Sequence, residues 1–113
     1  MDERATKLGL NEALYREVNE RVAEVAERFV EVETRVNRVH FNCECGDAGC
    51  TEQIDMTLSE YEGIRAEPTR FAVVIGHELP EVEQVVARHP AYLVVEKQHP
   101  EAERVAVETD PRS

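Results

Sequence analysis

The stretch His40-Phe41-Asn42-Cys43-Glu44-Cys45-Gly46-Asp47-Ala48-Gly49-Cys50 contains all three cysteines of the chain and two of its five glycines. Its thiols follow a C-x-C-x4-C spacing. Cys43 and Cys45 lie on the same side of an extended segment, because side chains alternate along a strand. Gly46 and Gly49 allow the loop to turn back and deliver Cys50. Thiolates gathered on a tight turn are typical of a zinc knuckle.

The number of cysteines also bears on their chemistry. We see no secretory signal pattern, and three thiols cannot all pair within one chain, so metal ligation is favoured over structural disulfides. We therefore predict one bound zinc ion. Three alternatives remain open at this stage: reduced thiols without a metal, a redox disulfide from Cys50 to Cys43 or Cys45, and an iron–sulfur cluster, whose usual C-x2-C spacing is absent.

A structural zinc ion takes four ligands, so one must come from outside the cysteines. His77 ends an apolar run of strand length and follows Gly76, which places it on a turn within reach of the knuckle. His40 is nearest in sequence, but alternation puts it opposite the first two cysteines. Asp47 or water are further candidates. The remaining histidines each precede a proline and are expected in loops: His89 and His99. The predicted metal ligands are Cys43, Cys45, Cys50 and His77.

Before the cysteines, apolar residues recur every three or four positions from about Leu8 to Val39. This heptad spacing predicts one long amphipathic helix, after a frayed end at residues 1–7. The first seam of its apolar stripe comprises Leu8, Tyr15, Val22, Phe29 and Val36. The second seam comprises Asn11, Val18, Val25, Val32 and Val39. Acid–base pairs four residues apart, such as Glu17–Arg21, support the helix.

The narrow apolar stripe has two interpretations. It packs on the protein's own sheet, or it pairs as a coiled coil with a second copy or with a partner's helix. A helix of about 30 residues is about 45 Å long. A compact domain of this size has a radius of gyration of only about 13 Å. We therefore expect part of the helix to overhang the domain and to contact a homodimer mate or another protein.

Short elements follow the cysteines. Strands are predicted over 41–45 and 52–56, joined as a hairpin with the metal loop as its turn. Thr57 and Glu60 form a capping box, which predicts a helix to about Ala66. Further strands are predicted over 71–75 and 92–95, with a short helix beginning at Pro80 between them. We expect a strand over 104–109, although the spacing of its apolar residues also fits a helix.

Together these elements predict an α+β fold. A long N-terminal amphipathic helix, residues 1–39, precedes a small α+β zinc-binding domain, residues 40–113. The second part is expected to contain a small, mainly antiparallel sheet, two short helices and the zinc knuckle.

Charge and hydropathy restrict the partners. The net charge is −11, and most of it falls in residues 41–113. Such an acidic body repels phosphate backbones, which argues against direct nucleic-acid binding. No apolar run approaches the length of a membrane span, so we expect a cytoplasmic protein that does not bind membranes. A basic protein partner is compatible with the charge, as is a simple role in solubility.

Several motifs resemble those of a group of short actinobacterial proteins to which no activity is assigned. The motifs are Phe41-x-Cys43-Glu44-Cys45-x4-Cys50-Thr51-Glu52, Leu58-x2-Glu60-Tyr61-Glu62, Arg70-Phe71 and Gly76-His77-Glu78. The resemblance covers most of the chain and implies a shared cysteine–histidine pattern. The chain departs from it at Asp47-Ala48-Gly49, where the group usually carries Asp-Pro-Asp or a similar segment.

Three functional hypotheses fit these features. The first is a zinc-stabilised protein–protein interaction or regulatory module. The second is a thiol-based redox or metal sensor, in which a change at the knuckle reaches the preceding helix. The third, which is the least favoured, is a zinc enzyme with Glu44 or Glu78 as its base. The H-x-E and C-x2-C pairing of the zinc deaminases is missing.

Overall fold

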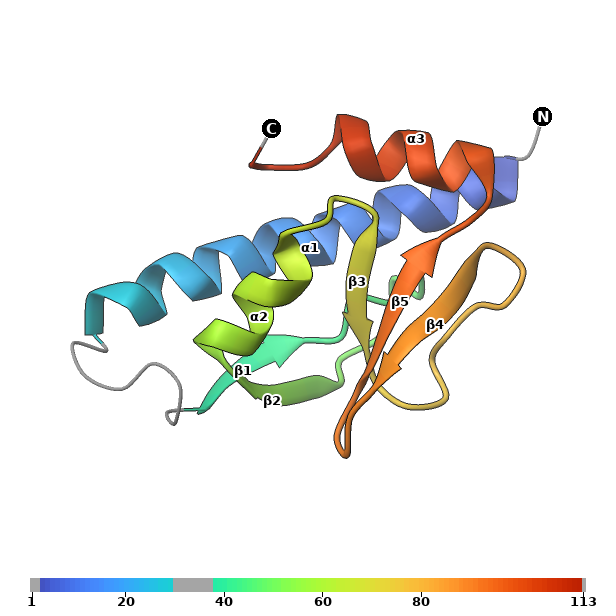
Figure 1. The fold of residues 1–113 in the computed structure, drawn as a ribbon. Helices are drawn as coiled ribbons and strands as arrows, with labels where there is room; N and C mark the ends of the chain where they lie inside the picture. Colours follow the sequence, from blue (N-terminus) through green and yellow to red (C-terminus); the bar gives the residue numbers. More distant parts are fainter. Residues whose placement is uncertain (1–2, 30–37, 113) are drawn as a thin grey trace.

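The computed structural model describes residues 3–29 and 38–112, and its α+β architecture confirms the predicted fold class. Figure 1 shows a long helix that runs along the length of the molecule, with the strands and two shorter helices packed beside it. The elements are α1 (Glu3–Phe29), β1 (Arg38–Asn42), β2 (Gln53–Thr57), α2 (Leu58–Arg65), β3 (Arg70–Val73), β4 (Glu83–Arg88), β5 (Leu93–Lys97) and α3 (Pro100–Glu108).

The strands form two small antiparallel sheets. β1 pairs with β2, and the second sheet has the order β3-β5-β4. The first hairpin continues past β1, because the Cys43 N–H donates to the Glu52 carbonyl at 3.0 Å. The Glu44 N–H then donates to the Ala72 carbonyl at 2.8 Å, next to β3. The cysteine loop is therefore the turn of the hairpin, as predicted, and it adjoins the second sheet.

α2 begins where its capping box predicts. The Thr57 hydroxyl accepts from the Glu60 N–H, and the Glu60 carboxylate accepts from the Thr57 N–H. These two bonds satisfy backbone donors that the first turn of a helix leaves unpaired. The inward residues predicted for this helix are buried: Leu58, Tyr61 and Ile64.

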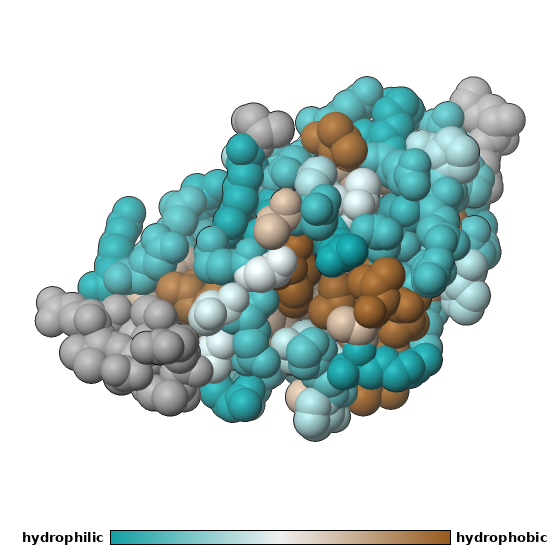
Figure 2. Space-filling model, in the orientation of Figure 1, coloured by the Kyte–Doolittle hydropathy of each residue, from teal (hydrophilic) through white to brown (hydrophobic). Residues whose placement is uncertain are grey.

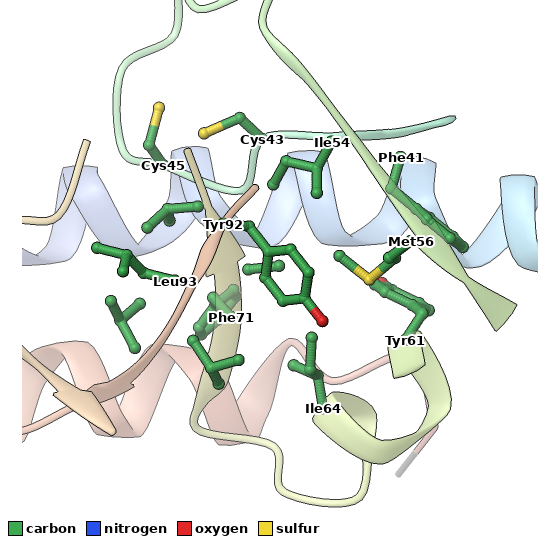
Figure 3. Close-up of a cluster of buried hydrophobic side chains, with 14 of the residues drawn as sticks. Phe41, Cys43, Cys45, Ile54, Met56, Tyr61, Ile64, Phe71, Tyr92 and Leu93 are labelled. Carbon is green, nitrogen blue, oxygen red and sulfur yellow. The ribbon is translucent and has the colours of Figure 1, made fainter. Parts of the chain in front are cut away.

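The apolar core lies between the two sheets and α2. Its larger side chains include Phe41, Ile54, Met56, Tyr61, Phe71 and Leu93. The rings of Phe41 and Tyr61 stack with centroids 4.3 Å apart. Figure 3 shows Cys43 and Cys45 at one end of this cluster, next to each other. The two cysteines are themselves buried, so the core supports the candidate metal ligands directly.

The long helix exists, but its predicted bounds are wrong. α1 begins at Glu3, within the segment predicted to be frayed, and ends at Phe29. Val39, assigned to the helical seam, lies in β1, where it faces Met56 of β2. The predicted seam positions Val32 and Val36 lie outside the described residues. The heptad spacing therefore indicated a helix correctly and overran its C-terminal end.

Two further elements differ from prediction. The segment after Pro80, predicted as a helix, forms β4 and pairs with β5, with a bulge between Val85 and Ala87. Residues 104–109, expected as a strand, belong to the helix α3 and the turn that follows it. Pro100 is at the first position of α3, where its missing N–H costs nothing. The His99 side chain accepts from the Glu101 N–H at 3.2 Å and caps the same end.

The surface seen in Figure 2 is mostly hydrophilic. Its apolar residues gather mainly over β4 and β5. Among the described residues, no helix is long and apolar enough to cross a membrane.

Candidate metal centre

The structure brings the four predicted ligands together. The sulfurs of Cys43, Cys45 and Cys50 and a ring nitrogen of His77 all lie within 4.8 Å of one another. The His77 Nδ1 is 3.6 Å from the Cys43 Sγ and 3.6 Å from the Cys50 Sγ. Zn–S bonds of about 2.3 Å and Zn–N bonds of about 2.0 Å in a tetrahedron give an S···N edge of about 3.5 Å. The observed spacing therefore fits a tetrahedral ion of zinc's size.

Backbone donors point at all three sulfurs. The Val74 N–H donates to the Cys43 Sγ at 3.2 Å. The N–H groups of Asp47 and Glu52 donate to the sulfurs of Cys45 and Cys50. Such N–H···S bonds stabilise the thiolate form, which is the form that binds metals. The cysteine loop and the segment after β3 thus supply both the ligands and the groups that neutralise part of their charge.

The loop conformation depends on Gly46 and Asp47. A Cβ at Gly46 would lie 2.7 Å from the Leu8 side chain and 3.1 Å from that of Leu79, so a larger residue would require these side chains to shift. The Asp47 carboxylate accepts from the Gly49 N–H at 2.9 Å, and its carbonyl accepts from the Cys50 N–H at 3.0 Å. Asp47, an alternative ligand in the sequence analysis, therefore shapes the turn, and it is not among the four clustered ligand atoms.

His77 reaches the cysteines from the turn after β3. The backbone N–H of His77 donates to the Val74 carbonyl at 2.9 Å. The preceding Gly76 has a φ of 96°, a left-handed conformation that favours glycine. This turn places the imidazole beside the sulfurs with Nδ1 toward them, which leaves Nε2 to carry the proton of the neutral ring. The centre consequently links the hairpin to the β3–β4 connection.

α1 holds the loop from outside. The Asn11 amide donates to the Gly46 carbonyl at 2.9 Å. The Tyr15 hydroxyl lies 2.8 Å from the Ala48 carbonyl and 3.0 Å from the Cys50 carbonyl, to which it donates. Asn11 and Tyr15, which were assigned to the two predicted heptad seams, therefore contact the cysteine loop and do not face a second helix.

Without a metal, the thiols share protons unequally. A hydrogen bond from the Cys43 thiol lowers the pKa of Cys45 to about 5. Two effects raise the pKa of Cys43 above its ordinary value: the larger is the donation of this hydrogen bond, and the second is burial. Burial also raises the pKa of Cys50. A divalent cation among the sulfurs reverses this arrangement, because it favours three thiolates at once.

The other histidines lie elsewhere. His40 is exposed on β1 and pairs with Asp55 of β2. His89 follows β4 and stacks on Tyr92, with ring centroids 4.4 Å apart. His99 caps α3. None of these three belongs to the four-residue cluster, in agreement with the preference for His77.

Sequence reasoning misjudged Glu44, which was considered as a catalytic base. It is fully buried between the two cysteines, on the opposite side of the segment. Its carboxylate accepts from the Asn19 amide at 2.8 Å, the Tyr61 hydroxyl at 3.0 Å and the Ala72 N–H at 3.0 Å. Burial raises its pKa. Alternation around the C-x-C motif predicts only that this side chain lies on the face opposite the cysteines, and the structure shows that there it fastens α1, α2 and β3 together.

The second considered base, Glu78, accepts from the Gly76 N–H at 2.8 Å and thereby supports the histidine turn. With three sulfurs and one imidazole in place, the protein itself can fill all four positions of a tetrahedral ion. Catalytic zinc sites usually keep one position for water or substrate. The chemistry that this arrangement supports is therefore tight ligation that joins distant parts of the chain.

Comparisons of the chain with protein-family models, with curated proteins and with solved structures found no match. The assignment of the centre accordingly rests on its own geometry.

Proposed function

We propose that this chain is a small cytoplasmic zinc protein whose Cys3His centre is structural and which acts as a protein–protein interaction or regulatory module. One observation carries the zinc assignment: three sulfurs and one imidazole converge within 4.8 Å, at spacings that suit a tetrahedral ion. Three soft thiolates with one imidazole favour zinc over calcium or magnesium, which prefer oxygen ligands.

A structural role is favoured by what the ligands connect. Cys43 and Cys45 follow β1, Cys50 precedes β2, and His77 follows β3. An ion at this point crosslinks the two sheets across about thirty residues, in a domain of only 113 residues. Small domains gain most from such a crosslink, because their cores are limited in size.

The interaction role is supported by α1. Its outward face carries exposed apolar side chains at Leu10, Leu14, Val18 and Val25. Exposed apolar residues that gather on one helix face are typical of a protein contact. The acidic charge favours a protein partner over nucleic acid or an anionic lipid surface, because both carry negative charge.

The zinc proposal is tested by native mass spectrometry of the purified protein. We expect one zinc per chain, and replacement of zinc by cobalt should give the absorption of a tetrahedral site with thiolate ligands. Cys50→Ser should lose the metal, whereas Ser59→Ala, at an exposed position of α2, should keep it. A folded, fully reduced chain that binds no zinc would contradict the proposal.

A second candidate function, a thiol-based redox sensor, is favoured by one specific observation. All three thiols are free and clustered, and Cys50 is only half-buried. Hydrogen peroxide would take two electrons from two thiolates, forming an S–S bond and two hydroxide ions, with release of the zinc. The Tyr15 hydroxyl of α1 donates to the carbonyl of Cys50, so a conformational change at Cys50 would be transmitted to α1. Reversible zinc release at low peroxide would support this function, and resistance of the centre to peroxide would exclude it.

A further inference from the structure

The two long faces of α1 have opposite chemistry. The side toward the rest of the protein buries four polar residues: Glu12, Arg16, Asn19 and Glu20. The exposed apolar residues lie on the other side: Leu10, Leu14, Val18 and Val25. At about 100° per residue, these four fall within an arc of about 80°. The four residues form an apolar stripe that Arg21 interrupts between Val18 and Val25, because Arg21 falls in the same arc, and nothing in the described part of the chain covers the stripe.

The stripe contains both a projection and a groove. Leu14 is its most exposed member, at 62%. An open apolar groove of about 410 Å³ lies between α1 and β1, one to three helical turns after Leu14. Its lining comprises Val18, Arg21, Val22, Val25, Ala26 and Val39. A surface that carries a projection and a matching groove on one face can complement itself through a two-fold axis.

We propose that the partner of α1 is a second copy of this chain, paired antiparallel through this face with the two-fold axis near Val18. This inference rests on the proposed role of α1 as the contact surface. In such a pair, a residue four positions before the axis faces the residue four positions after it. Leu14 of each copy therefore meets Val22 of the other and enters its groove.

The charges beside the stripe favour the antiparallel direction. Glu17, Arg21, Glu24 and Arg28 alternate in sign along one edge of α1. Within one chain, Arg21 already pairs with Glu17 at 3.1 Å and with Glu24 at 2.6 Å. An antiparallel two-fold pair turns the same edge of both helices toward each other, so an alternating row meets its own reverse. Glu17 is then level with Asn19 of the other copy and lies about 3 Å along the axis from that copy's Arg21, within reach of its long side chain. A parallel two-fold pair turns this edge toward the opposite edge of the partner helix, which carries the uncharged Val22, so the charged row meets no complementary charge there.

Sedimentation velocity over a concentration series tests the dimer. We expect the zinc-loaded chain to form dimers, and Leu14→Glu to raise the dissociation constant by at least about tenfold. Val107→Glu is the matched control, because Val107 is a similarly exposed apolar residue on α3. Zinc content is measured for each variant. A zinc-loaded chain that stays monomeric overturns this inference alone, whereas a metal-free folded chain overturns the zinc proposal.

Charge exchange separates contact between chains from effects within one helix. In the Glu17→Arg variant, two arginines face each other across the axis, and in the Arg21→Glu variant two glutamates do. Each variant alone should dimerise more weakly than the unaltered chain. An equimolar mixture of the two variants should dimerise as strongly as the unaltered chain, because the heterodimer pairs each arginine with a glutamate. No recovery on mixing would overturn the proposed register.

Single cysteine substitutions test the direction. Val18→Cys lies near the axis of an antiparallel pair, so it should form an intermolecular disulfide under mild oxidation with the zinc retained. Val25→Cys should not, because its equivalent lies far along the partner helix. Crosslinking of both variants to their equivalents would show a parallel pair and overturn the antiparallel arrangement.

Discussion

Two regions fasten α1 to the rest of the molecule by different physical means. At the candidate metal centre, Asn11 and Tyr15 hold the loop that carries three of the four clustered ligand residues. Along the inner face of α1, buried polar side chains bind many separate partners. With the proposed zinc ion bound, the first region would depend on that single ion and should fail as a unit. The second distributes its stabilisation over several bonds, so its loss should be graded.

The inner face of α1 contains more charge than a small core normally does. Arg16 is fully buried, donates to the carbonyls of Pro68 and Ala106, and lies over the Phe71 ring at 4.6 Å. The Lys97 ammonium donates to Glu12 of α1 and to Glu83 of β4, and all three are buried. Buried charges survive only when they are paired, so this face commits α1 to one position.

The largest effect is expected at the metal centre. His77→Ala should abolish stoichiometric zinc binding and lower the free energy of unfolding by more than about 5 kcal/mol, because a structural zinc contributes about 10–16 kcal/mol of binding free energy to folding. Chemical unfolding, with zinc measured by mass spectrometry, checks both. His40→Ala is the control, since His40 is exposed and outside the cluster. Full zinc content in His77→Ala would remove His77 from the ligand set.

The next largest effect tests the inner face. Arg16→Met keeps much of the side-chain volume but leaves two carbonyls and the nearby Glu44 carboxylate without their cation. We expect a loss of about 3–5 kcal/mol in the free energy of unfolding, with zinc stoichiometry intact. Arg104→Met, at an exposed position of α3, should cost less than about 1 kcal/mol. Equal losses in both variants would contradict the comparison.

The pH dependence of stability tests the buried group of Glu12, Glu83 and Lys97. Burial raises the pKa of Glu12 from 4.5 to about 8 despite the neighbouring Lys97 ammonium. Between pH 4.5 and 8 the folded state therefore binds one more proton at Glu12 than the unfolded state does. The free energy of unfolding consequently decreases as the pH rises toward 8. We expect unfolding free energies to fall by about 1–2 kcal/mol more in the unaltered protein than in Glu12→Gln between about pH 6.5 and 8. Parallel pH profiles for the two proteins would refute this assignment.

The smallest effect concerns the contact between α1 and the loop. Tyr15→Phe removes only the hydroxyl that donates to the Ala48 and Cys50 carbonyls. We expect a loss of about 1 kcal/mol and faster removal of zinc by a chelator, with unchanged stoichiometry. Tyr92→Phe, whose hydroxyl bonds Glu60 far from the loop, should leave the chelation rate unaltered. Identical chelation rates for both variants would show that α1 does not stabilise the centre.

The same comparison explains what the sequence could predict. The three cysteines lie within eight residues, so alternation and two glycines were enough to place them on one turn. His77 was predictable because it follows a glycine at the end of an apolar strand. In the inner face of α1, Arg16 binds a carbonyl 90 residues away and Glu12 a lysine 85 residues away. No local pattern marks these pairs, and on a helix they resemble solvent-facing charges.

The incorrect elements have a similar cause. Val82, Val85 and Val86 have helical spacing, yet strand pairing with β5 and a bulge override it. α3 was assigned as a strand because Val105 and Val107 alternate, but the helix buries Ala102, Val105 and Ala106. Its Val105 side chain would lie 3.2 Å from a Cβ added at Gly9 of α1, so contact with α1 selects the helix. Tertiary contacts thus decided both segments.

The most direct test of the account is X-ray absorption at the zinc edge on the purified, unmodified protein, together with its metal content. The account predicts one zinc per chain, bound by three sulfurs and one imidazole nitrogen, with no oxygen ligand. Loss of the nitrogen signal in His77→Ala would identify its source. A reduced and folded protein without zinc, or a shell that contains water in place of the imidazole, would contradict a structural Cys3His centre.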